Sequence, residues 1–147
     1  MEVEDLVTNL IAACRDDANS YWRASEILFD QPDIAHFCEE EAQNRDLAAD
    51  VLEKRLSASG KKPNPKILLA PAAEGWSQPG PGDRDVKAVI EACHTAEERT
   101  IKMFEEAEGT FPDQWRWEIG EHYQNMRSAA AKLHAWLQNK EIGPEFG

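Results

Sequence analysis

Apolar residues recur every three to four positions along almost the whole 147-residue chain, and no stretch alternates for long enough to make a strand. This spacing is typical of amphipathic helices and predicts an all-α protein. A chain of this length can bury one core without disulfides or a structural metal. We therefore predict a single domain over residues 1–142, with residues 143–147 as a tail that could be native or a cloning remnant.

Breaks in the pattern divide the domain into four expected helices. The sequence "DQPD" ends the first helix and places Pro32 in the first turn of the second. The sequence "TFPD" offers Thr110 as the N-cap of the last helix, with Asp113 three residues on. The expected helices cover, approximately, residues 3–29, 32–60, 85–109 and 111–139.

Residues 61–84 interrupt the helical pattern. This segment is rich in proline and glycine, so it cannot form a long helix. Ile67, Leu68, Leu69 and Trp76 suggest that it lies on the protein rather than acting as a free linker. The link between the first and second helices is short, and so is the link between the third and fourth, which predicts two antiparallel hairpins. A segment as long as residues 61–84 can cross the full length of a bundle. We expect a ferritin-like four-helix bundle with a long crossover between the second and third helices.

The first and third expected helices resemble each other. "IAACRDDANSYWRASEIL" (residues 11–28) and "IEACHTAEERTIKMFEEA" (residues 90–107) agree at isoleucine, alanine and cysteine when they are aligned. The alignment places Ala18 in the first helix opposite Glu97 in the third. A duplicated helix has thus kept an acid in one copy only, and this bears on whether the bundle holds a metal.

Charge and cysteine content narrow the class of protein. The formal net charge of -12 would repel nucleic acid and an anionic membrane surface. The opening residues include several acids and do not resemble a signal peptide, and no apolar run approaches the roughly 18 residues that span a bilayer. Cys14, Cys38 and Cys93 are odd in number and far apart, which indicates buried thiols in a reducing compartment. We expect a cytoplasmic protein.

Several segments together resemble a known family. "CRDDANSYWRASEIL", the ending "LEKRLSASGKKP" of the second helix, a tryptophan in the connector and "VIEACHTAEERTIKMFEEA" are similar to the ferritin-like family catalogued as domain of unknown function 2383. The likeness covers almost the whole chain, and its most specific part is the third helix. It implies a bacterial four-helix ferritin-like bundle whose biochemical role is not established. In the wider ferritin-like group, each hairpin supplies a glutamate from its first helix and a Glu-x-x-His from its second to hold two metal ions.

Four residues are candidate metal ligands when the chain is compared with that pattern. Glu97 lies on the inward stripe of the third helix and is the best candidate, while Asp17 lies beside Ala18 and could substitute for the missing acid. Glu41 is the inward acid of the second helix, and His122 lies on the apolar stripe of the fourth. Iron or manganese would take such oxygen and imidazole ligands.

This chain also departs from the ferritin-like ligand pattern at the positions where histidines are expected. Asn44 follows Glu41 where a histidine is expected, and Gln124 and Asn125 stand where the second histidine should follow Glu121. As an alternative to metal ligation, Glu41 and Glu97 could be buried acids paired with Arg45, Arg99 or His122. The remaining histidines are expected at the surface, and they are His36, His94 and His134.

Two classes of function follow from these observations. The missing histidines and Ala18 favour a bundle with a degenerate di-metal site that acts as a structural or interaction protein, as a homodimer or with a protein partner. The alternative is an iron- or manganese-binding ferritin-like protein with a redox or storage role, a role implied only by the resemblance. No phosphate-binding loop, nucleophile elbow or paired-cysteine motif points to another reaction, and the sequence assigns no enzyme activity.

Overall fold

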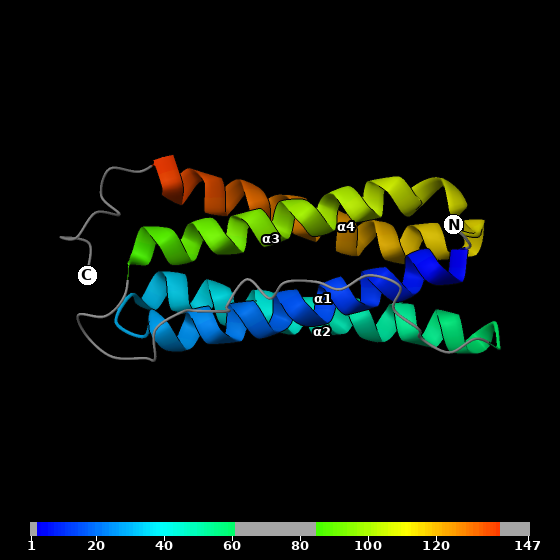
Figure 1. Cartoon of the computed structure of the whole chain (residues 1–147), viewed down its shortest axis with the longest axis horizontal. Helices are drawn as coiled ribbons and strands as arrows, with labels where there is room; N and C mark the ends of the chain where they lie inside the picture. The colour runs from blue at the N-terminus through cyan, green and yellow to red at the C-terminus, as the bar shows by residue number, and fades with distance from the viewer. Residues whose placement is uncertain (1–2, 61–84, 139–147) are drawn as a thin grey trace.

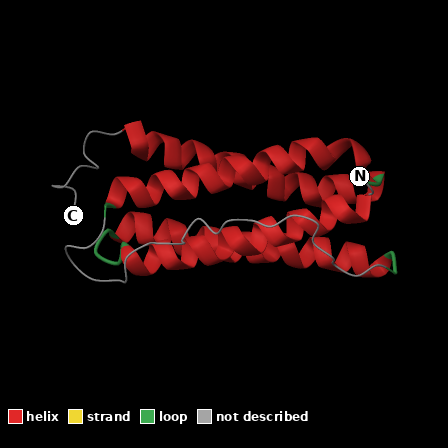
Figure 2. Ribbon diagram, viewed as in Figure 1, coloured by secondary structure: helices red, strands yellow, loops and turns green. Residues whose placement is uncertain are grey.

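The computed structural model describes residues 3–60 and 85–138, and these residues form a bundle of four long helices (Figure 2). The helices are α1 (Val3–Ile27), α2 (Pro32–Ala58), α3 (Val86–Ala107) and α4 (Asp113–Gln138). A short 3₁₀ helix, η1 (Glu108–Thr110), joins α3 to α4. The described residues contain no strand, which confirms the predicted all-α class.

The helices form two hairpins that lie one on the other (Figure 1). Within each hairpin the two helices are antiparallel, while α2 and α3 run in the same direction. α1 packs on both α2 and α3, and α4 packs on α3 and α2. These directions are the ones that the link lengths predicted. The connector at residues 61–84, its expected packing and the tail at 143–147 lie outside the described residues.

Local sequence signals account for both ends of α2 and the start of α3. Pro32 occupies the first turn of α2, where its missing N–H would have no helical partner. Gly60 follows the end of α2 with a positive φ of 79°, a conformation that glycine adopts without a steric penalty. Asp85 caps α3, because its Oδ1 accepts a hydrogen bond of 3.1 Å from the Ala88 N–H.

The predicted cap of α4 is wrong. Thr110 belongs to η1, and its hydroxyl donates to the Ala107 carbonyl at 2.6 Å instead of capping α4. α4 begins only at Asp113. The chain continues past α3 as a 3₁₀ turn, so the threonine completes that turn and is too early to serve the next helix.

The apolar core is divided into two clusters along the length of the bundle. One gathers residues of all four helices around Leu10, Leu52, Phe104 and Met126. The other gathers Tyr21, Ile34, Ile90, Leu133 and their neighbours. The predicted inward stripes supply both clusters. All three cysteines are buried and free, as the sequence predicted.

Candidate functional site

A layer of polar side chains lies between the two apolar clusters. It is formed by Asp17 from α1, Glu41 and Arg45 from α2, and Glu97 and Thr100 from α3, all of them buried. Each occupies an inward position of its helix, so the sequence places charge where a bundle usually places leucine. Buried charges are costly unless they are paired, and the pairing therefore defines this layer.

Arg45 is the centre of the layer. Its side chain is 1% exposed, and its guanidinium lies between the carboxylates of Glu97 and Glu41. Nε donates to Glu97 Oε2 at 3.2 Å and Nη2 donates to Glu97 Oε1, while Nη2 lies 3.2 Å from Glu41 Oε1. The guanidinium carbon also lies 5.8 Å from the centre of the Tyr21 ring, a cation–π distance. One cation thus joins the two helical hairpins at mid-height.

Uncharged side chains donate further hydrogen bonds to the carboxylate oxygens of Glu41 and Glu97. The Tyr21 hydroxyl donates to Glu97 Oε1 at 2.6 Å. The amide of Asn125 on α4 donates to Glu41 Oε1 at 3.2 Å, and that of Asn44 donates to Glu41 Oε2 at 3.3 Å. Each of the four carboxylate oxygens therefore accepts at least one hydrogen bond from the protein.

Asp17 occupies the same layer with separate partners. The Thr100 hydroxyl donates to its Oδ2 at 2.6 Å, and the Arg99 guanidinium lies 3.4 Å from its Oδ1. Arg99 makes its shorter contact, 2.9 Å, with Asp16 at the edge of the bundle. Burial and, after it, the charge of Glu97 together raise the pKa of Asp17 to about 8, against the opposing effects of Thr100, Arg45 and Arg99. Asp17 therefore holds a proton near neutral pH.

Burial and neighbouring charges also have opposing effects on the pKa values of Glu41 and Arg45. Burial raises the pKa of Glu41, and the neighbouring Arg45 charge opposes this rise. For Arg45, burial alone would lower the pKa, but Glu97 and the other acceptors outweigh burial and raise it. Arg45 is therefore a permanent cation inside the bundle.

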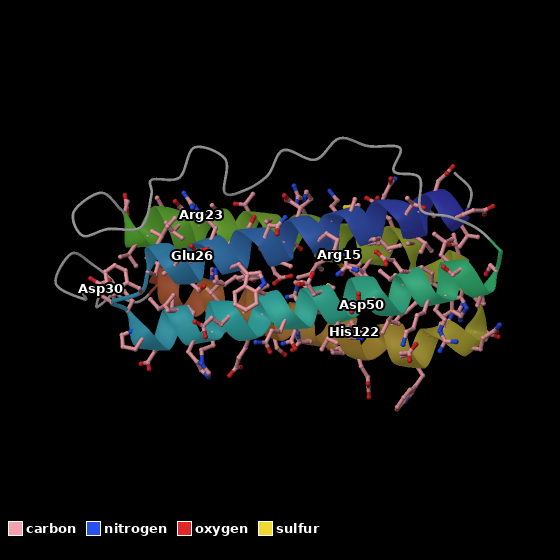
Figure 3. The ribbon with its side chains drawn as sticks, turned by 90° about the horizontal axis from the view of Figure 1, so that it is seen from below. Arg15, Arg23, Glu26, Asp30, Asp50 and His122 are labelled. Atoms are coloured by element: carbon pink, nitrogen blue, oxygen red, sulfur yellow. The ribbon has the colours of Figure 1, made fainter. Side chains whose placement is uncertain are left out.

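His122 takes no part in this arrangement. It lies half-buried on α4 (Figure 3). In the described part of the chain it makes no hydrogen bond or ion pair. Burial lowers its pKa, the Arg45 charge adds to this effect, and Glu118 and Glu121 oppose it. Of the four predicted ligands, the structure brings Glu41 and Glu97 onto one guanidinium, places Asp17 in the same layer and leaves His122 aside.

The donor set does not fit a di-metal centre. The Arg45 guanidinium lies where a metal between Glu41 and Glu97 would have to bind, and two asparagine amides stand in place of the expected histidines. Among residues 3–60 and 85–138, no three His, Cys, Asp or Glu side chains are grouped so that they could hold a metal. Metal ligation by these residues stays a prediction.

Sequence reasoning named Arg45 only as one of three possible partners for the buried acids. Its position was informative, because Cys38, Glu41, Arg45 and Ala48 follow the i, i+3, i+4 spacing of an inward stripe. Thr100 was not identified, although it follows Glu97 by three residues on the inward face of α3. A hydroxyl at that position is a signal for a buried acceptor nearby.

The bundle surface carries further charge pairs. Arg15 of α1 binds Asp50 of α2 at 2.7 Å (Figure 3). It also binds Asp46 and Glu53 of α2, at 2.9 and 3.1 Å. Its side chain is 37% exposed, so these contacts contribute little to stability. They provide an exposed counterpart to the buried Arg45.

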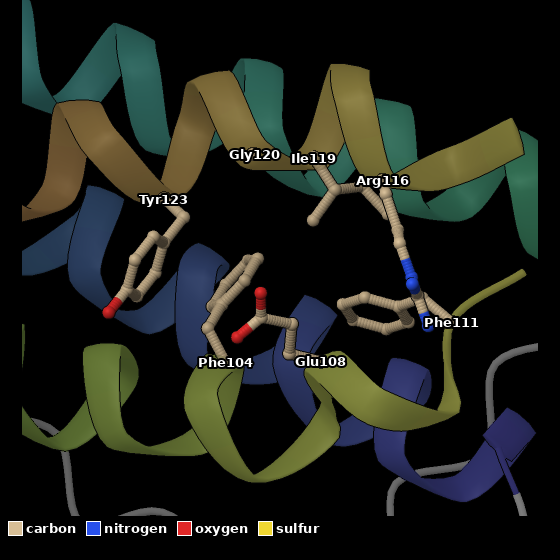
Figure 4. A pocket seen from close by; sticks show the side chains of 7 residues that line it. All are labelled: Phe104, Glu108, Phe111, Arg116, Ile119, Gly120 and Tyr123. Atoms are coloured by element: carbon tan, nitrogen blue, oxygen red, sulfur yellow. The ribbon is translucent and has the colours of Figure 1, made fainter. Parts of the chain in front are cut away.

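A small pocket lies at the end of the bundle near η1, far along the helices from the polar layer. Glu108, Phe111, Arg116 and Tyr123 are among the residues that line it (Figure 4). Its volume of about 50 Å³ has room for water but not for an organic substrate.

The chain matches no protein-family model, no curated protein and no solved structure. The resemblance to domain of unknown function 2383 therefore stays a prediction. In the described parts of the chain, every helix is too short or too polar to cross a bilayer.

Proposed function

We propose that the chain is a ferritin-like bundle whose α2–α3 connector is a long crossover, and that Arg45 takes the place of the metal centre. In this proposal the bundle acts as a structural or interaction protein. The observation that carries it is the buried Arg45 guanidinium between Glu41 and Glu97. The parallel direction of α2 and α3 supports the crossover.

An arginine can hold carboxylates from different helices together, as a metal ion does, but it cannot take over the reactions of a metal ion. Its planar guanidinium supplies one positive charge and five fixed donors, which suit two carboxylates from different helices. A reactive metal centre needs an open position for water or substrate. In the polar layer, the oxygens of Glu41 and Glu97 already accept bonds from Arg45, Tyr21 and the two asparagines. The layer therefore holds the hairpins together and offers no site for a reaction.

Titration with Fe²⁺ or Mn²⁺ tests this proposal. We expect no binding that depends on Glu97, because a divalent ion would have to displace a paired guanidinium. The measurement is calorimetry and elemental analysis of the wild-type protein and the Glu97→Ala variant, both purified without chelator.

One result would reverse this proposal. If wild type binds iron or manganese at about one equivalent or more and Glu97→Ala does not, Arg45 must swing aside to admit the metal. The alternative function, an iron- or manganese-binding protein with a redox or storage role, would then be correct. Asp17 or water would fill the position that Ala18 leaves open.

We extend the proposal to the partner and the compartment. A bundle without a reactive centre works by contact, and we infer that it forms a homodimer or binds a protein partner. Trp117 is 77% exposed and Leu47 is 54% exposed. Large exposed apolar side chains of this kind are frequent at interfaces. The three free, buried thiols suit a reducing compartment such as the cytoplasm.

Sedimentation velocity over a wide concentration range tests the homodimer. We expect a species of twice the monomer mass that dissociates on dilution, and weaker association in Trp117→Ser if that side chain lies in the contact. The control is Lys54→Ser, which changes an exposed polar residue of α2. A strictly monomeric protein at all concentrations would rule out the homodimer and leave only a different protein as partner.

A further inference from the structure

A pair of histidines lies outside the polar layer, in an open groove between α3 and α4. His94 comes from α3 and His134 from α4, and the groove has a volume of about 520 Å³. The centres of the two imidazole rings are 5.9 Å apart, with a tilt of 36° between the ring planes. Both residues were expected at the surface. Sequence reasoning did not foresee that the hairpin would bring them together.

We propose that His94 and His134 form a binding site for one borderline transition-metal ion, of the Zn²⁺ or Cu²⁺ class, with water as the remaining ligands. Two imidazoles bound to the same ion, each at a metal–nitrogen distance of about 2.0–2.1 Å, have ring centres roughly 5–6.5 Å apart. The observed separation of the two ring centres lies in this range. Imidazole is also the ligand that zinc and copper favour.

Glu98 supplies the supporting contact that such a histidine needs. Its Oε1 lies 3.1 Å from His94 Nε2, one helical turn away. A carboxylate at this position holds the proton on Nε2, so Nδ1 keeps the lone pair that a metal requires. Metal-binding histidines commonly have a carboxylate beside the second ring nitrogen for this reason.

The surroundings are compatible with a cation. The formal net charge of -12 favours the approach of a divalent ion. Two basic residues, Lys102 and Arg127, also line the groove, about two helical turns from the histidines. Arg127 lies over the Tyr123 ring at 5.9 Å, and Tyr123 donates to Glu105 at 2.6 Å. The two basic residues that line the groove therefore lie toward its other end, away from the imidazoles.

The test uses the full chain without a histidine tag, titrated with Zn²⁺ in a calorimeter. We expect one Zn²⁺ per chain, with affinity falling at least about tenfold in His94→Gln and in His134→Gln, since losing a direct ligand should cost at least as much as losing an outer contact. Glu98→Gln should weaken binding by a smaller factor. Electron paramagnetic resonance with Cu²⁺ should detect two imidazole nitrogens in wild type and one in either histidine variant.

His36 provides a matched control. It forms the same pair with an acid four residues on, at 2.6 Å from Glu40, but it has no second histidine in ring contact among the described residues. His36→Gln should therefore keep wild-type affinity. Equal losses in all three variants, unchanged affinity in His94→Gln and His134→Gln, or one Zn²⁺ shared by two chains would each overturn the proposal. None of these outcomes bears on Arg45, because the proposed function is tested with iron and manganese at Glu97.

Discussion

Replacing Arg45 with methionine should lower the free energy of unfolding by about 3–5 kcal/mol, because it leaves two buried carboxylates without their cation. Glu41 and Glu97 are 6% and 0% exposed, so water cannot take over the role of the guanidinium. The loss should shrink at acidic pH, where the two acids can take up protons. Urea denaturation monitored by circular dichroism measures the effect.

Two further variants test whether the loss of stability comes from the buried carboxylates left without a cation. Arg15→Met removes a guanidinium with three carboxylate partners at the surface, and it should cost no more than about 1 kcal/mol. The double variant Arg45→Met with Glu97→Gln should recover much of the stability, because it removes one of the stranded charges together with the cation. A cost below 1 kcal/mol for Arg45→Met alone would show that the buried acids are neutral and that Arg45 does not pair with them.

Replacing Asp17 with asparagine should stabilise the protein at alkaline pH, on the order of 3–5 kcal/mol at pH 9. Burial raises the pKa of this carboxyl from 3.8 to about 8. Between these values the folded protein holds a proton that the unfolded chain has lost, so wild-type stability falls as pH rises. Below pH 3.8 both states are protonated, and above about pH 8 both are ionised and the penalty is constant. Asparagine removes the penalty, and its carbonyl can still accept from Thr100.

The measurement for Asp17→Asn is the free energy of unfolding from pH 4 to pH 9. The difference from wild type should be small at pH 4 and should grow until about pH 8. Asp16→Asn is the control, because it changes the neighbouring acid that contacts Arg99 and leaves Asp17 ionisable. It should keep the wild-type dependence on pH. A difference for Asp17→Asn that does not change with pH would mean that Asp17 is ionised in the folded protein.

The sequence predicted the fold best where one periodic pattern extends over many residues. The three-to-four-residue apolar spacing predicted the four helices, and apolar residues at this spacing, such as Leu52 and Phe104, form the core. It failed at Thr110, because a cap depends on where the preceding helix stops, and the chain there continues as a 3₁₀ turn. The candidate acids were also found, since a carboxylate on an apolar stripe is conspicuous in any helix.

The sequence by itself determined the helices, their directions and the burial of Asp17, Glu41 and Glu97, because these follow from local periodicity and link length. Only the tertiary structure decided the pairing within the buried layer. Arg45 reaches Glu97 across 52 residues of chain, and Asn125 reaches Glu41 across 84. The ring contact between His94 and His134 likewise depends on how α3 and α4 align as they pack. Helical spacing states which face a side chain occupies, but the partner on another helix depends on the register and rotation of that helix, which only packing sets.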